Sequence, residues 1–298
     1  MRKVNLGILL NVVMTMSLVA GCDQKTNSSL YFSTSFSPNY LINSDDLQYD
    51  ANDDKFNIEN TTAGSCLEGK TFYWLGDSVI YGSSTNGVAV SEFLSKTTGC
   101  LCVKDAISGT KLQCIDNDPL SFLSRVVSGT TLKPDKEIDG FFIQISVNDV
   151  SSLNYKNMGD LSSQTNINLN SFDVSTTLGS LEYIVNYIEN TWDCPIFLCT
   201  QSFYENSGSR QAGFFNPDWY TVLLDKVYSL IDKYDTFSNF DVEIINLFYD
   251  DAFNNAVSDL YFDWAMDDSI HPKLAGYRNW WTPYFISYLE AFFANAVD

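Results

Sequence analysis

The sequence has few positive charges and only one histidine. Its 298 residues contain 17 Lys and Arg against 37 Asp and Glu, so the formal net charge is −20. A surface this acidic repels nucleic acid and anionic lipid, and we therefore expect no nucleic-acid partner. The single histidine is His271, and the seven cysteines include no Cys-x-x-Cys pair. Because zinc-type sites draw mainly on such ligands, we expect no metal site and no cofactor.

No stretch after residue 22 is long and apolar enough to cross a membrane. Residues 6–19 are mostly apolar and follow Arg2 and Lys3, but they are too short to span a bilayer comfortably. The sequence Val-Ala-Gly-Cys that ends at Cys22 resembles a bacterial lipobox. We interpret residues 1–21 as a lipoprotein signal peptide, and we expect an extracytoplasmic protein anchored to the bacterial cell membrane by lipid on Cys22. An ordinary secretory signal or an uncleaved anchor is the alternative.

Six further cysteines follow Cys22. They are Cys66, Cys100, Cys102, Cys114, Cys194 and Cys199. An even number in an exported chain permits disulfide bonds, and buried free thiols are the alternative. Two of them, Cys100 and Cys102, fall on one face of a predicted strand, where residues two apart rarely bond each other. Any bridge from this pair is therefore expected to reach another part of the chain.

The chain divides into two parts after the predicted signal. Residues 22–69 are polar and acidic with little hydrophobic periodicity, so we interpret them as a tether. In residues 70–298, short apolar runs alternate with helical patterns, which is typical of βαβ units around a parallel sheet. Strands are predicted at 71–75, 101–105, 140–146, 195–200 and 242–247. Helices are predicted at 88–97, 119–127, 172–192, 217–234 and 274–294.

The first predicted strand stops at Gly76-Asp77-Ser78. Gly76 permits a sharp turn, and Ser78 then lies at the carboxyl end of the strand, where open α/β sheets place their ligands. A serine held there is a candidate nucleophile if a base can reach it. Without a base, the same serine is a helix cap.

His271 is the only imidazole available as that base. Asp268 stands three residues before it, and Pro272 follows and restricts the local backbone. A carboxylate at this distance can accept a hydrogen bond from the imidazole and fix its tautomer, which is the role of the third member of a catalytic triad. Asp267 competes for this role, but the Asp-x-x-His spacing selects Asp268.

Four short motifs between residue 70 and the C-terminus resemble the sequence blocks of the SGNH hydrolases, also called GDSL lipases or esterases. The first is Gly-Asp-Ser-Val at 76–79, and the last is Asp-Ser-Ile-His-Pro at 268–272. Between them, residues 104–110 resemble the block that supplies a glycine, and residues 145–149 resemble the Gly-x-Asn-Asp block. One departure is Ser146, which stands where the family usually has glycine.

The resemblance implies a fold and a set of roles. The fold is a three-layer α/β/α arrangement of flavodoxin-like type, with a doubly wound, mainly parallel five-stranded sheet and the motif loops at one edge. Ser78 attacks the ester, His271 takes its proton and Asp268 orients the imidazole. The oxyanion hole consists of the backbone N–H groups of Ser78 and Gly109 and the side-chain amide of Asn148. The implied activity is carboxylic ester hydrolysis through an acyl-enzyme.

Two other functions use the same fold. An acyltransferase would carry out the same chemistry with an acceptor other than water, and a surface-binding lipoprotein would have lost turnover. A complete triad argues against the binding protein, whereas the choice between hydrolase and transferase depends on acceptor pockets. The expected partners are an ester substrate, either an acylated glycan or a lipid, and the membrane through Cys22.

Overall fold

A computed structural model provides the fold of the chain. It describes residues 64–129, 131–133, 135–151, 155–163, 168–204, 215–237, 240–257 and 259–295. The predicted signal peptide, Cys22 and most of the predicted tether lie outside the described residues. Among the helices that the structure describes, none has the length and apolar character needed to cross a membrane.

Five parallel strands form one sheet in the order β2-β1-β3-β4-β5. The strands are β1 (Thr71–Gly76), β2 (Leu101–Ala106), β3 (Gly140–Gln144), β4 (Ile196–Cys199) and β5 (Val242–Ile245). The predicted five-stranded parallel sheet is confirmed, with strand ends shifted by one or two residues. The strand order reverses at β1, so the loops after β2 and β3 flank the end of β1, where such sheets bind ligands.

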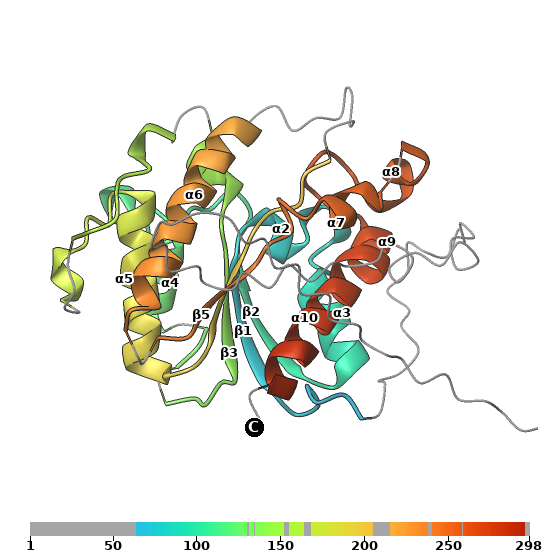
Figure 1. Ribbon diagram of the computed structural model, residues 1–298, viewed down its shortest axis with the longest axis horizontal. Helices are drawn as coiled ribbons and strands as arrows, with labels where there is room; N and C mark the ends of the chain where they lie inside the picture. The colour runs from blue at the N-terminus through green and yellow to red at the C-terminus, as the bar shows by residue number, and fades with distance from the viewer. Residues whose placement is uncertain are drawn as a thin grey trace, which may run out of the picture. The chain divides into compact units, whose positions relative to one another are not determined.

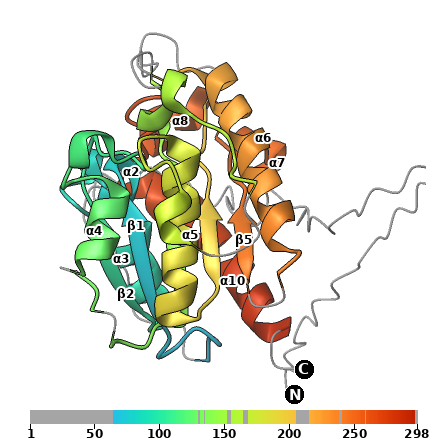
Figure 2. The ribbon, with the colours of Figure 1, turned by 90° about the vertical axis from the view of Figure 1, so that its left-hand side faces the viewer.

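Helices cover both faces of the sheet, which gives the predicted three layers (Figures 1 and 2). On one face lie α4 (Phe122–Ser128), α5 (Thr177–Trp192) and α6 (Pro217–Tyr234). On the other lie α3 (Val90–Thr98) and α10 (Thr282–Asn295). Helix α6 has the predicted bounds, because Pro217 suits the first turn and the Asn216 side chain accepts hydrogen bonds from the first amides.

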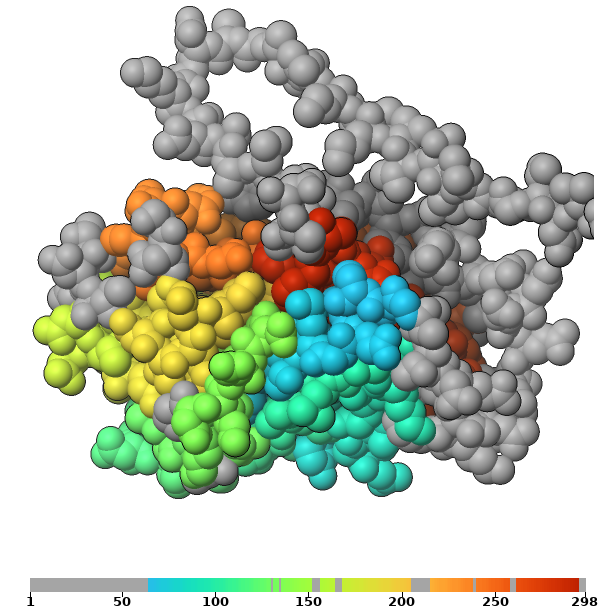
Figure 3. Space-filling model, turned by 90° about the horizontal axis from the view of Figure 1, so that it is seen from below, coloured from blue at the N-terminus to red at the C-terminus, as the bar shows by residue number. Residues whose placement is uncertain are grey.

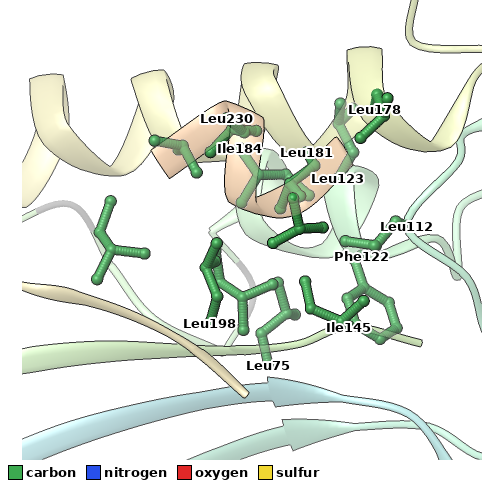
Figure 4. Packing of buried hydrophobic residues seen from close by; sticks show 14 of the residues in the cluster. Leu75, Leu112, Phe122, Leu123, Ile145, Leu178, Leu181, Ile184, Leu198 and Leu230 are labelled. Carbon is green, nitrogen blue, oxygen red and sulfur yellow. The ribbon is translucent and has the colours of Figure 1, made fainter. Parts of the chain in front are cut away.

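The sheet has an apolar core on each face. Successive residues of β1 alternate between them: Tyr73 and Leu75 belong to the core under α5, and Phe72 and Trp74 to the core under α10. Figure 4 shows the first core, where leucine and isoleucine side chains of α5 pack above those of the strands. Burial on both faces explains why the central strands β1, β3 and β4 appear in the sequence as continuous apolar runs rather than as alternating patterns.

Three helical regions show the largest differences from the prediction. The helix predicted at 172–192 begins at Thr177, because the side chain of Thr176 accepts a hydrogen bond from the Gly179 amide and caps it there. The helix predicted at 274–294 is divided into α9 (Leu274–Gly276), a π-helical turn and α10. The third difference is an omission: short helices α7 (Asp251–Asn255) and α8 (Asp259–Ala265) precede the His271 loop and were not predicted.

At the edge where the strands begin, the first described residues lie beside the end of α10. Figure 3 views this edge and shows the blue segment against the red one. Ser65 Oγ donates to Glu290 Oε1 over 2.8 Å, and Lys70 Nζ pairs with Asp139 Oδ1 over 3.3 Å. These contacts fasten residues 65–70 at the edge opposite the carboxyl ends of the strands.

The six cysteines of the described part of the chain are free thiols. The pair on one face of the second strand, Cys100 and Cys102, has its sulfur atoms 3.6 Å apart, in hydrogen-bond contact but not in a disulfide. Cys194 and Cys199 are buried, and burial raises the pKa of both thiols. The fold therefore needs no disulfide between these residues, in line with the alternative of buried thiols.

Candidate active site

Ser78 begins the short helix α2 (Ser78–Tyr81) directly after β1. Asp77 caps this helix, because its Oδ1 accepts a hydrogen bond from the Val79 amide over 3.1 Å. Gly76 is required for a reason of space: a Cβ at this position would lie 2.4 Å from Cβ of Ile80 and 2.8 Å from Oε1 of Gln144. The strand thus runs into the helix so closely that no side chain fits at the junction, and Ser78 is held against the sheet edge.

The three residues predicted as a triad lie within hydrogen-bond distance in series. Ser78 Oγ lies 2.9 Å from His271 Nε2, and His271 Nδ1 lies 2.7 Å from Asp268 Oδ2. The other carboxylate oxygen of Asp268 accepts from the backbone amides of Ile270 and His271, over 2.9 and 2.8 Å. These bonds fix the carboxylate, which in turn fixes the orientation of the imidazole.

Asp267, the competitor for the orienting role, points elsewhere. Its Oδ2 accepts from Ser84 Oγ over 2.9 Å, and the residue is exposed. The backbone also supports the loop here, since the Asp267 amide donates to the His271 carbonyl over 2.8 Å. Of the two adjacent aspartates, only Asp268 is hydrogen-bonded to the imidazole.

The charges of the pair shift both pKa values. Burial by itself would lower the pKa of His271, but the hydrogen bond and negative charge of Asp268 outweigh it, and the pKa is raised. For Asp268, burial raises the pKa, and its bonds to His271 and to backbone amides outweigh that effect, so the pKa is lowered. An anionic Asp268 beside a basic imidazole is the arrangement that proton abstraction from Ser78 requires.

Two backbone N–H groups, those of Ser78 and Gly109, lie at the edge of the sheet where Ser78 is held and are candidate hydrogen-bond donors. The N–H of Ser78 is the first of a helix and has no acceptor within that helix. Gly109 lies in the exposed loop after β2 with φ +80°, and a Cβ there would meet nothing within 4 Å. Glycine is therefore needed for its backbone conformation rather than for space. Across the described chain, no hydrogen bond is formed by the Gly109 amide.

Asn148 lies in the 3₁₀ turn after β3 (Val147–Val150), on the other side of β1 from Gly109. Its side-chain amide donates to Asp77 Oδ2 over 3.1 Å and to the Thr110 carbonyl over 3.0 Å. The next residue, Asp149, is fully buried and accepts from the backbone amides of Leu112 and Gln113. Burial raises the pKa of Asp149 to about 6. These contacts join the loops that carry Gly109 and Asn148.

Asp77 and Ser146 take part in the site although the sequence assigned them no role. Asp77 is fully buried, and Ser146 Oγ donates to its Oδ2 over 2.7 Å. The backbone amide of Asp77 donates to Gln144 Oε1 over 2.9 Å. The only signal in the sequence was the serine at position 146, where the resembling family has glycine.

A buried ion pair lies beneath the Gly109 loop. Arg125 Nη1 contacts Asp105 Oδ1 over 2.5 Å, and both side chains are about 5% exposed. The second guanidinium nitrogen donates to the Gly76 carbonyl over 2.9 Å and to Thr110 Oγ1 over 3.4 Å. Arg125 thus ties the carboxyl ends of β1 and β2 to the loop. This role could not be predicted from the sequence, because an arginine in an amphipathic helix normally faces solvent.

The loop that carries His271 is held from β4. Gln201 Nε2 donates to the Ile270 carbonyl over 2.6 Å, and the Tyr204 amide donates to the Ser269 carbonyl over 3.0 Å. The backbone N–H of Gln201 in turn donates to the Tyr220 hydroxyl of α6 over 2.8 Å. No group of three or more metal-ligating side chains occurs in the described residues.

Several solved structures share this fold. One crystal structure is 20% identical with a TM-score of 0.55, and the match covers 76% of this chain and 98% of that chain. A protein from Lactobacillus plantarum is 18% identical with a TM-score of 0.55, covering 75% and 98%. A GDSL-like lipase from Parabacteroides merdae is 15% identical with a TM-score of 0.50, covering 74% and 95%. The chain therefore has an SGNH/GDSL hydrolase fold. No protein-family model and no curated protein matches the sequence.

Proposed function

We propose that the protein is a serine esterase that cleaves a carboxylic ester through an acyl-enzyme. The observation that carries this proposal is the series of contacts from Ser78 Oγ to His271 Nε2, at 2.9 Å, and from His271 Nδ1 to Asp268, at 2.7 Å. A nucleophile, a base and an orienting carboxylate in this geometry suit acyl transfer and have no purpose in a binding protein. The fold adds support, because it is the fold of a GDSL-like lipase.

In the acylation step, Ser78 Oγ attacks the ester carbonyl while His271 Nε2 accepts the hydroxyl proton. Asp268 stabilises the imidazolium that forms, because its carboxylate is hydrogen-bonded to Nδ1 of the ring. The negative charge that develops on the carbonyl oxygen is received by the amides of Ser78, Gly109 and Asn148. The imidazolium then gives its proton to the departing alcohol, and the acyl group stays on Ser78. Water, activated by the same imidazole, releases the acid in the second half of the reaction.

Labelling with a fluorophosphonate probe tests the proposal directly. The wild-type protein should react at Ser78, as located by peptide mass spectrometry, and Ser78→Ala should not react. Ser84→Ala is the matched control, because Ser84 is exposed nearby and bonds only to Asp267 in the described structure. This control should label like the wild type. Labelling at another serine would contradict Ser78 as the nucleophile, and no labelling of the wild type would favour the binding-protein alternative.

The proposed substrate is an O-acylated glycan or a lipid ester. A panel of para-nitrophenyl esters from acetyl to palmitoyl, run beside acetylated oligosaccharides, separates the two. Turnover confined to short acyl chains and acetylated sugars would assign glycan de-acylation, and turnover of long chains would assign lipid hydrolysis. Release of free acid, rather than transfer to an added alcohol or sugar acceptor, separates the esterase from an acyltransferase with the same triad.

We also propose that the mature protein begins at a lipidated Cys22 and is held on the outer side of the bacterial cell membrane. The support comes from the sequence: the short apolar segment at 6–19 and the Val-Ala-Gly-Cys motif. Intact-mass measurement on detergent-extracted protein tests it. A lipid-modified N-terminus at Cys22 is expected. An unmodified Cys22 or an uncleaved Met1 would contradict the anchor, and neither result bears on the esterase.

A further inference from the structure

The Ser146 hydroxyl and the Asn148 side-chain amide are directed at the same two oxygen atoms. Ser146 Oγ lies 2.7 Å from Asp77 Oδ2 and 3.2 Å from the Thr110 carbonyl. Asn148 Nδ2 lies 3.1 Å from the same carboxylate oxygen and 3.0 Å from the same carbonyl. Three protons, one from the hydroxyl and two from the amide, are thus available to two acceptors.

This sharing matters because the Asn148 side-chain amide is also the proposed donor to the oxyanion. Its two N–H groups point to Asp77 and Thr110 in the resting site, so donation to an oxyanion requires it to give up one of these bonds. Asp77 is fully buried and Thr110 nearly so, and water cannot replace the lost donor there. A buried acceptor left without its hydrogen bond typically costs about 1–3 kcal/mol, and more when it is charged.

We propose that Ser146 is a positioning residue that releases the Asn148 amide for the oxyanion. Its hydroxyl keeps the shared acceptors hydrogen-bonded when the amide turns towards the reacting carbonyl. The hydroxyl is well placed for this, because Ser146 is fully buried and its Oγ accepts from the Asn148 backbone amide over 3.1 Å. That bond occupies a lone pair and directs the single proton towards Asp77 Oδ2 or Thr110. Glycine, which the SGNH hydrolases usually have at this position, offers no such donor. The inference rests on the proposed esterase function.

The electrostatics of Asp77 agree with this arrangement. Burial raises the pKa of the Asp77 carboxyl, and the hydrogen bond from Ser146 is the strongest influence in the opposite direction. The hydroxyl of Ser146 therefore supports the carboxylate form of Asp77.

Kinetics of Ser146→Ala, Ser146→Gly and Ser146→Thr with para-nitrophenyl acetate test the proposal, with active sites titrated by fluorophosphonate so that only folded enzyme is counted. We expect Ser146→Ala and Ser146→Gly to lower kcat about tenfold or more, the factor that one unmatched buried acceptor implies, with KM within about twofold. Ser146→Thr keeps the hydroxyl and should retain most of kcat. An unchanged kcat in both Ala and Gly variants would overturn the proposal.

A double-mutant cycle with Asn148→Ala separates positioning from a general structural role. If Ser146 acts through the amide, Ser146→Ala should change kcat by no more than about twofold in the Asn148→Ala background. A loss by the same factor in both backgrounds would show that Ser146 acts independently of Asn148, and would overturn the proposal. Absence of any Ser78-dependent turnover would instead refute the esterase function itself, so the two failures are distinguishable.

Discussion

The hydroxyl oxygen of Ser78 lies 2.9 Å from Nε2 of His271, although 193 residues separate the two in the chain. Ser78 reaches this position at the end of β1, and His271 comes from the loop beyond β5 and α8. His271 is also the only histidine in the sequence. Any imidazole ionisation in a kinetic experiment therefore belongs to this one contact, which makes the pH dependence unusually easy to interpret.

We expect kcat/KM to fall at low pH through the one imidazole ionisation that the chain provides. The imidazole must be neutral to accept the Ser78 proton, so activity is present above the pKa of His271 and lost below it. Asp268 raises this pKa, so the acidic limb should lie above the ordinary histidine value of about 6.5. Steady-state rates over a pH series would measure it. An acidic limb near pH 4, where carboxylates titrate, would contradict the assignment of His271 as the base.

The two adjacent aspartates offer a matched pair of variants. Asp268→Asn should lower kcat about a thousandfold or more, because the amide carries no charge to stabilise the imidazolium and can hold the wrong tautomer. Asp267→Asn should keep kcat within about threefold, since that side chain bonds to Ser84 rather than to the imidazole. Equal losses in the two variants would contradict the orienting role of Asp268.

Local patterns were sufficient to predict the sheet and the edge where its motif loops meet. The central strands β1, β3 and β4 are continuous apolar runs because both of their faces are covered, as in Gly-Phe-Phe-Ile-Gln of β3. Parallel strands bring the loops after β1, β2 and β3 together, so Ser78, Gly109 and Asn148 could be placed at one edge without coordinates. Helix ends were predicted less well: Thr176 caps α5, so this helix begins at Thr177 and not at the predicted residue 172.

Contacts between distant residues that lie outside the four motifs and the predicted triad were beyond the sequence. Arg125 and Asp105 pair in the interior across 20 residues, and Ser146 bonds to Asp77 across 69. Nothing local distinguishes a buried arginine on a short helix from an exposed one. The serine at position 146 was visible as a departure from the family pattern, but its partner became visible only with the loops in place.

Asn148→Ala should lower kcat about a hundredfold with little change in KM. The side-chain amide acts on charge that exists only in the transition state, so ground-state binding should not depend on it. The fold should survive, because Ser146 still donates to Asp77 when the amide is removed. Steady-state kinetics with a thermal unfolding curve would check both parts. A raised KM with an unchanged kcat would place Asn148 in substrate binding instead.

The last prediction concerns the buried ion pair beneath the Gly109 loop. Arg125→Met should lower the free energy of unfolding by about 3–5 kcal/mol, because it leaves the buried Asp105 carboxylate without its positively charged partner. Replacing Asp105 by Asn in the same chain should recover part of the loss, since the stranded charge is removed. Lys226→Met is the control: its partner Asp160 is 90% exposed, and surface pairs contribute about 0–1 kcal/mol. Urea unfolding measures all three variants. A loss in Arg125→Met no larger than in Lys226→Met would mean that the guanidinium does not hold the ends of β1 and β2 together, and the Gly109 loop would need another support.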